Sequence, residues 1–145
     1  MKSTPAEHVW LLMQQFVDAH SRHGDIADAL GFRLGAGRGQ VLFQLHDGPR
    51  TLSELAEANN FDPPYATLVV DKLEAHGLVE RRPHPDDRRR KLVALTDAGR
   101  AAVTTAEEIR RRPPGAVSAL RADDRRQLTA VLQRLIDADA EGAAS

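Results

Sequence analysis

The chain has 145 residues, 20 basic and 21 acidic, with a formal net charge of −1 and 41% apolar residues. This is typical of one soluble domain, or of one domain with appended helices, and no stretch is long and apolar enough for a membrane span. The absence of cysteine excludes disulfides, cysteine nucleophiles, cysteine-type zinc sites and thiol redox sensing, and with a start unlike a signal peptide it favours a cytoplasmic protein without a membrane partner.

The first predicted helix begins at Thr4-Pro5-Ala6-Glu7, which combines a cap, a proline in the first turn and the acid of a capping box. Its apolar stripe has the spacing of one helix face and comprises Val9, Leu12, Met13, Phe16 and Val17. Trp10 and Leu11 lie off this stripe. A helix that is apolar on two sides needs two partners, which indicates burial between subunits.

Four glycines between residues 31 and 39 predict a hinge or a loose connection. The run Gly35-Ala36-Gly37-Arg38-Gly39 is not a dinucleotide loop, because no strand precedes it and the glycine spacing is wrong. The apolar run over residues 41–45 then predicts a short buried helix that ends near Asp47-Gly48-Pro49.

Two short helices joined by a tight turn follow, which is the pattern of a helix-turn-helix. Thr51 and Glu54 form a second capping box at the first helix, and Asn59-Asn60 ends it. Asp62-Pro63-Pro64 begins the second helix, which ends at His76-Gly77. Its predicted inner face comprises Ala66, Val69, Val70 and Leu73.

Two strand-like segments around a loop rich in proline and aspartate predict a hairpin over residues 78–96. Residues 81–91 contain six basic and two acidic side chains, a local charge of +4 that the whole-chain average hides. A solvated loop without function is the plain alternative for such a charge run. A helix-turn-helix followed directly by a basic hairpin is, however, the pattern of a winged helix.

Two further helices complete the chain. Thr96-Asp97 caps an alanine-rich helix that Pro113-Pro114 ends, and the last helix begins near Ala122-Asp123-Asp124. The last helix carries an apolar stripe of Leu128, Val131, Leu132, Leu135 and Ile136. Because both ends of the chain carry such stripes, we expect a symmetric dimer whose two recognition helices reach half-sites roughly 34 Å apart. A monomer whose terminal helices fold back on their own chain is the alternative.

The hairpin carries the most specific motif. Asp87-Arg88-Arg89-Arg90-Lys91-Leu92-Val93-Ala94-Leu95-Thr96, followed by Gly99, resembles the wing of the MarR family of bacterial transcription regulators. The segment from Val70 to Arg81 is similar to the end of that family's recognition helix. The motif match covers about Thr51 to Gly99, and the order of the helices fits nearly the whole chain.

The resemblance implies a mainly α-helical winged helix-turn-helix with a small β-hairpin wing, in an obligate homodimer that binds double-stranded DNA. It divides one compact chain into an N-terminal dimerisation helix and connection (1–34), a DNA-binding region (35–99) and C-terminal dimerisation helices (100–145). The function it implies is that of a repressor of a pseudo-palindromic operator, released by a small aromatic or anionic ligand. A winged-helix protein-interaction module without sequence-specific DNA binding is the alternative.

The same resemblance implies the DNA-binding residues of the wing. Arg89 would enter the minor groove, where a narrow groove concentrates negative potential. Asp87 would orient Arg89, and the alternative is that Asp87 only forms the turn. Candidates for phosphate contact are Arg81, Arg82, Arg88, Arg90 and Lys91.

The predicted recognition helix departs from the family habit. Pro64 and Tyr65 occupy positions that commonly hold serine or threonine, and Leu68 one that often holds arginine. Tyr65 and Thr67 remain as base readers with Lys72 toward phosphate, while Pro64 and Leu68 could contact thymine methyl groups. Packing within the chain is the alternative for Leu68. We therefore expect DNA shape and phosphate contacts to carry much of the affinity.

Ligand, metal and enzyme chemistry complete the predictions. A ligand pocket between the dimer helices and the winged helix would draw on Trp10, Met13, Phe16, Phe43 and Arg100, for each of which ordinary packing is the alternative. The spacing His20-x-x-His23-x-Asp25 supplies too few ligands for a structural metal, so we expect a solvated helix end and no cofactor. No nucleophile elbow, P-loop or paired carboxylates appear, so we expect no enzyme activity.

Overall fold

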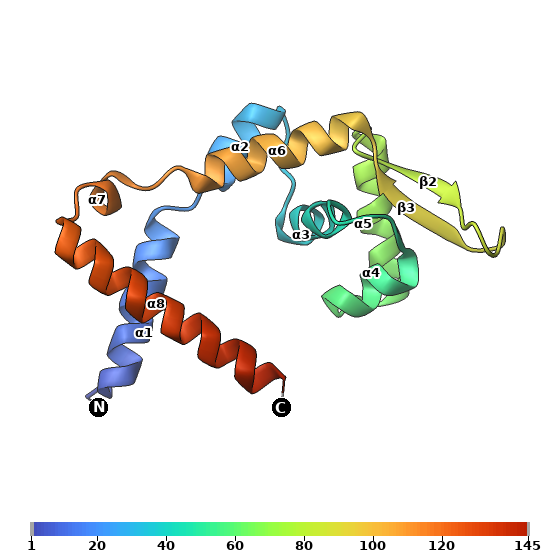
Figure 1. Ribbon diagram of the computed structural model, residues 1–145. Helices are drawn as coiled ribbons and strands as arrows, with labels where there is room; N and C mark the ends of the chain where they lie inside the picture. Colours follow the sequence, from blue (N-terminus) through green and yellow to red (C-terminus); the bar gives the residue numbers. More distant parts are fainter. Residues whose placement is uncertain (1, 145) are drawn as a thin grey trace. The chain divides into compact units, whose positions relative to one another are not determined.

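The structure is a computed structural model that describes residues 2–144 and is mainly helical, with a small antiparallel sheet, as the sequence predicted (Figure 1). Its elements in chain order are α1 Pro5–Ala19, α2 His23–Leu30, α3 Ala36–Leu45, β1 Arg50–Thr51, α4 Leu52–Asn59, α5 Pro63–Ala75, β2 Val79–Pro83, β3 Lys91–Leu95, α6 Asp97–Arg111, α7 Gly115–Ser118 and α8 Ala122–Ala143.

The helix starts that the sequence predicts are confirmed by their caps. Thr4 and Glu7 form the full capping box of α1. The Thr51 hydroxyl accepts a hydrogen bond from the Glu54 amide at 3.1 Å, which is one of the two bonds of the predicted second capping box. The Asp62 carboxylate accepts a hydrogen bond from the Tyr65 amide at 2.8 Å. These side chains satisfy amides that have no partner within the first helical turn, so they fix where α1, α4 and α5 begin.

The sheet has the strand order β1-β3-β2, with all pairs antiparallel. The hairpin of β2 and β3 runs from Val79 opposite Leu95 to Pro83 opposite Lys91, which confirms the predicted wing. β1 adds a short third strand, in which Arg50 lies opposite Val93. β1 could not be predicted from the sequence, because a strand of two residues is too short to show an alternation of apolar and polar side chains.

The hydrophobic core of the winged helix joins α3, α4, α5 and the sheet. Leu42, Leu55, Leu73 and Val93 are among its fully buried side chains. The predicted inner face of α5 is confirmed, since all four of its members are buried. This packing on one side leaves the opposite side of α5 exposed, so α5 presents a free surface along its length.

Two local predictions are wrong. The glycine-rich segment 31–39 is not a loose connection throughout, because α3 begins at Ala36 with Gly35 as its N-cap, in a conformation (φ 73°) that favours glycine. The helix α2 was also missed. It buries a single side chain, Ile26, against Ala106 and Ile109 of α6, and one buried residue leaves no apolar stripe in the sequence.

The chain divides into two compact units, Met1–Arg111 and Arg112–Ser145. In the first unit α6 packs against α2, α3 and β3, so its first four turns belong with the winged helix. The predicted division of the chain by function, at residues 34/35 and 99/100, therefore remains a prediction. The contacts within the structure place the boundary between its two units after α6.

The apolar stripes of α1 and α8 are uncovered. Neither helix has a buried residue among those described. Trp10 is 58% exposed and Ile136 is 62% exposed, and the other large exposed apolar side chains of the two helices are Val9, Leu11, Leu12, Phe16, Val17, Leu128, Val131, Leu132 and Leu135. Apolar surface of this extent on an exposed helix is characteristic of a contact surface.

Within residues 2–144, no helix is long and apolar enough to span a membrane. The same residues contain no group of three or more histidine, aspartate or glutamate side chains placed to hold a metal ion. His20 and His23 each make a local contact instead, to the Phe16 carbonyl oxygen at 2.8 Å and to the Ser21 hydroxyl at 3.1 Å.

Gly99 at the start of α6 permits the closest approach between this helix and the wing. A Cβ at this position would overlap the carbonyl oxygen of Leu78 and lie 3.0 Å from its carbonyl carbon. Because both obstacles are backbone atoms, neither can move aside without a shift of α6 against β2. Gly99 thus sets the distance between the winged helix and the helix that follows it.

We therefore expect Gly99→Ala to lower the free energy of unfolding by roughly 2–3 kcal/mol, the cost of overpacking a site that cannot relax. Gly39→Ala is the matched control, because no heavy atom lies within 4 Å of a Cβ there, and it should add about 0.5–1 kcal/mol through helix propensity. Urea unfolding at one fixed protein concentration measures both. Equal midpoints for the two variants would contradict the role given to Gly99.

Candidate nucleic-acid interface

The exposed side of α5 carries the side chains predicted to meet the bases. Tyr65 is 44% exposed and Leu68 is 51% exposed, so packing within the chain does not account for Leu68. Pro64, Thr67 and Lys72 are exposed as well. The structure therefore brings all five predicted residues of this helix onto one accessible surface.

The polar groups of this surface are few. The Thr67 hydroxyl donates a hydrogen bond to the Pro63 carbonyl oxygen at 3.1 Å, so its proton is already used and it offers acceptor lone pairs. The ring of Tyr65 packs edge-on against Phe61, with their centroids 4.8 Å apart. A surface with one phenol, one ammonium and several apolar groups can contact thymine methyls and phosphates but makes few base-specific hydrogen bonds.

The tip of the wing is held by Asp87. Its carboxylate accepts the backbone amide of Arg89 at 3.0 Å and faces the Arg89 Nε at 3.4 Å. Its carbonyl oxygen accepts the amide of Arg90 at 3.0 Å. Asp87 thus forms the turn and also holds Arg89. The sequence offered these two roles as alternatives, and the structure contains both contacts.

Arg89 is almost fully accessible, with 94% of its side chain exposed. Arg88, Arg90 and Lys91 beside it are exposed, and no carboxylate among the described residues pairs with them. An arginine whose Nε side faces a carboxylate while the rest of its guanidinium is exposed to solvent is arranged to enter a narrow groove of negative potential. Its neighbours are free for phosphate contact.

Arg81 has a different environment from the one predicted. Its guanidinium lies 2.6 Å from Asp71 and 3.0 Å from Glu74, two acids of α5, so it joins the wing to the recognition helix. Partial burial lowers the pKa of Arg81, but the hydrogen bonds to Asp71 and Glu74 outweigh it and leave this pKa above its ordinary value. Arg81 is permanently charged and already paired, and its predicted contact with phosphate would require it to leave both carboxylates.

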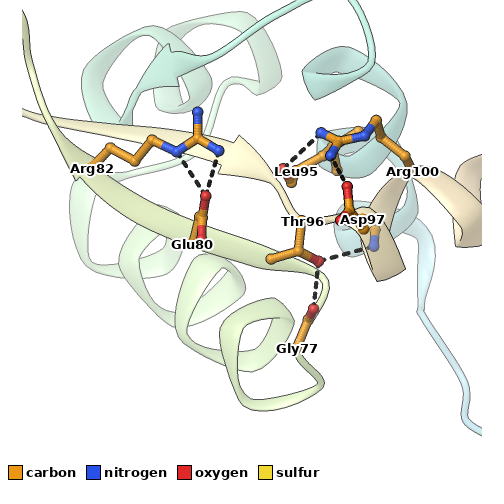
Figure 2. A network of polar contacts seen from close by, with 8 residues as sticks. Gly77, Glu80, Arg82, Leu95, Thr96, Asp97 and Arg100 are labelled. Carbon is orange, nitrogen blue, oxygen red and sulfur yellow. Dashed lines mark hydrogen bonds and ion pairs between the residues drawn. The ribbon is translucent and has the colours of Figure 1, made fainter.

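Arg82 is also paired, because its Nε donates to the Glu80 carboxylate at 2.7 Å (Figure 2). The ion pairs of Arg81 and Arg82 were not predicted from the sequence. Asp71 and Glu74 lie three residues apart on one helix, which is a signal of a shared ionic partner, but the identity of that partner depends on how the hairpin packs.

The wing is fastened to the helices on either side by Thr96. Figure 2 shows its hydroxyl between two backbone groups. The hydroxyl donates to the Gly77 carbonyl oxygen at 2.6 Å and accepts the Gly99 amide at 3.0 Å. One side chain therefore links the end of α5 to the start of α6, which explains the threonine of the wing motif in structural terms.

Of the five predicted pocket residues, Arg100 lies apart from the other four, because none of them lines the hollow that contains it. Trp10, Met13 and Phe16 lie on α1, and Phe43 packs against the core with Arg110 4.9 Å from its ring centroid. Arg100 pairs with Asp97 and donates to the Leu95 carbonyl oxygen at 3.2 Å (Figure 2). It lines a hollow of about 190 Å³ with Arg82 and His46 that contains none of the other four.

Comparison with known proteins matches this geometry to one family. Residues 37–91 match the model of the MarR family. The HTH-type transcriptional regulator BilQ of Clostridium symbiosum is 31% identical over 105 residues, which cover 70% of this chain and 73% of BilQ. The HTH-type transcriptional repressor NicR of Pseudomonas putida is 32% identical over 96 residues, which cover 63% of this chain and 59% of NicR.

The match to NicR spans less than two thirds of that relative's length. Among solved structures, that of RV1404 from Mycobacterium tuberculosis has a TM-score of 0.78 at 27% identity, covering 97% of this chain and 96% of that chain. The family consists of transcription regulators and not of enzymes. The winged helix, the arginine-tipped hairpin and these similarities together show that the chain belongs to the MarR family of transcription regulators.

Proposed function

We propose that this chain represses transcription by binding a pseudo-palindromic DNA operator as a homodimer. The observation that carries the proposal is the tip of the wing, where Asp87 holds the base of Arg89 and the guanidinium remains exposed. Together with the exposed side of α5, this tip offers one element to the major groove and one to the minor groove. A regulator of this kind acts on the chromosome, so the proposal includes a cytoplasmic location.

The homodimer is supported by the uncovered stripes of α1 and α8, where all the large apolar side chains except that of Met13 are 36–67% exposed. A twofold axis would bury the same stripe on both subunits and present two copies of α5 to one side of a duplex. The proposed major-groove residues are Pro64, Tyr65, Thr67 and Leu68. The proposed phosphate contacts are Lys72, Arg88, Arg90 and Lys91, while Arg81 acts first through its pairs with α5.

Release by a small aromatic or anionic ligand is the finer part of the proposal. The hollow that Arg100 lines places it near Arg82 and His46, which supports an anionic ligand, although both arginines already face a carboxylate. Trp10, Met13, Phe16 and Phe43 remain candidates for contacts that form in the dimer. If such a ligand weakens DNA binding, DNA must weaken ligand binding by the same factor.

Fluorescence anisotropy with duplex fragments selected from the host genome tests the proposal. Four phosphate contacts in each subunit give eight in a dimer, so the logarithm of the association constant should fall with the logarithm of salt concentration with a slope of about −7. The selected fragment should bind at least about 10³-fold more tightly than unrelated duplex. A protein that ignores duplex DNA even in dilute buffer would instead be a protein-interaction module.

A further inference from the structure

A hollow of about 250 Å³ lies beside α5, on the side that faces α3. Gly35 and Arg38 line it at the start of α3, and Tyr65, Leu68 and Lys72 line it along α5. The three residues of α5 are spaced as one helical stripe, and all three belong to the exposed side that the proposed function assigns to DNA. The hollow therefore continues the candidate interface toward α3.

Arg38 is held in this hollow by the glycine-rich segment. Its Nε donates to the Leu34 carbonyl oxygen, and a Cβ on Gly35 would lie 3.2 Å from its Nη2. Any larger residue at position 35 would press on the guanidinium and would also have to adopt φ +73°. No carboxylate among the described residues pairs with Arg38, so it is a positioned cation without a counter-charge.

Tyr65, on the α5 side of the hollow, also lies close to a glycine of α3. A Cβ on Gly37 would lie 3.4 Å from the Tyr65 hydroxyl, so this phenol packs directly against the first turn of α3. Lys72, two turns further along α5, is exposed. One guanidinium, one ammonium and one phenol therefore surround an open space without an acid, and this set of donors suits a phosphate group.

The cations on the two sides of α5 differ in whether a carboxylate pairs with them. On the side toward the wing, Arg81 is neutralised by Asp71 and Glu74. On the side toward α3, neither Arg38 nor Lys72 pairs with a carboxylate within residues 2–144. A helix about 10 Å wide in a major groove about 12 Å wide has a sugar-phosphate strand on each side. In the proposed complex the wing would contact one of these strands, and the hollow on the α3 side would face the other.

We propose that Arg38, together with Lys72, binds a backbone phosphate of the DNA strand that passes on the α3 side of the recognition helix. The inference rests on the proposed function and extends its interface to a helix that carries none of the predicted DNA contacts. It also gives the run Gly35-Ala36-Gly37-Arg38-Gly39 a role. Side chains at positions 35 and 37 would crowd the Arg38 guanidinium and the Tyr65 phenol, and glycines leave room for both groups.

The test measures operator affinity over a salt series for wild type, Arg38→Gln, Arg38→Lys and Arg33→Gln. The dimer holds two copies of Arg38, so Arg38→Gln should reduce the magnitude of the salt slope by about 1.8. It should weaken binding by about tenfold or more, equally for operator and unrelated duplex. Arg38→Lys should restore most of the slope, because it keeps the charge. Arg33 is exposed and outside the hollow, so Arg33→Gln should leave the slope unchanged.

The possible failures are distinguishable. If wild type binds duplex DNA and Arg38→Gln keeps the slope and affinity of Arg33→Gln, the phosphate contact is overturned and the proposed function stands. Titration with inorganic phosphate adds a second readout, since loss of phosphate binding in Arg38→Gln with an unchanged DNA slope would make the hollow a small-anion site and also overturn the inference. If wild type does not bind duplex DNA at all, the proposed function fails first. Equal thermal unfolding of Arg38→Gln and Arg38→Lys would show that charge and not folding separates them.

Discussion

Replacing Arg89 with alanine abolishes or severely weakens operator binding and leaves the folded dimer intact. The side chain is 94% exposed and contacts only Asp87 of its own turn, so its removal costs the fold little. In the complex, by contrast, each dimer would lose two guanidinium groups from the minor groove, and we expect affinity to fall by roughly 100-fold or more. A gel-shift series with purified variants measures the change.

Arg88→Ala is the matched control for this experiment. Arg88 is the preceding residue, is equally charged and exposed, and lacks the contact with Asp87. Its loss should reduce the magnitude of the salt slope by about 1.8, because one phosphate contact is lost in each of the two subunits, and should leave the preference for operator over unrelated duplex unchanged. Unchanged affinity in Arg89→Ala would remove Arg89 from the interface, and equal losses in the two variants would reduce it to an ordinary phosphate contact.

The double substitution Leu132→Asp with Leu135→Asp converts the dimer into monomers and thereby eliminates operator binding. The two leucines are 36% and 50% exposed in the single chain, in the middle of the α8 stripe. Two carboxylates in each copy of a twofold interface would be buried against one another without partners. A monomer then binds one half-site, and the gain from engaging two sites together is lost.

Light scattering at micromolar concentration measures the mass, and anisotropy measures binding of the same samples. Ala130→Asp with Gln133→Asp is the control, because it adds the same charge on the opposite side of α8. This control should remain dimeric and keep its affinity for operator. A dimeric Leu132→Asp, Leu135→Asp protein would show that the α8 stripe does not form the contact between subunits.

Much of the winged helix could be predicted because its signals are local. Thr4, Thr51 and Asp62 mark helix starts by hydrogen bonds within three residues, and the hairpin is marked by its loop and its arginines. The helix α2 and the strand β1 could not be predicted, since each is defined by what it packs against. A single buried side chain or a pair of residues leaves no periodic signal.

The candidate interface was predictable in its residue types and less so in its pairings. Asp87 beside Arg89 follows from a spacing of two residues, and the structure confirms their contact. Arg81 of β2 pairs with two acids of α5, so this contact joins a strand to a helix. The positive charge of the hairpin alone predicted that Arg81 would be a free cation. Arg38 was overlooked because glycines around it predicted a loose loop, whereas they form the start of a helix with a fixed guanidinium.

If the uncovered stripes of α1 and α8 form the proposed contact between two subunits, the stability of this protein depends on its concentration. Free energy released when subunits associate is part of the free energy that keeps each chain folded, so the melting temperature should rise with protein concentration. A cell that makes little of this regulator would then hold a larger share of unpaired, protease-sensitive chains than a cell that makes much of it. Abundance and lifetime would rise and fall together, so the amount of active regulator would respond to changes in its synthesis more than proportionally.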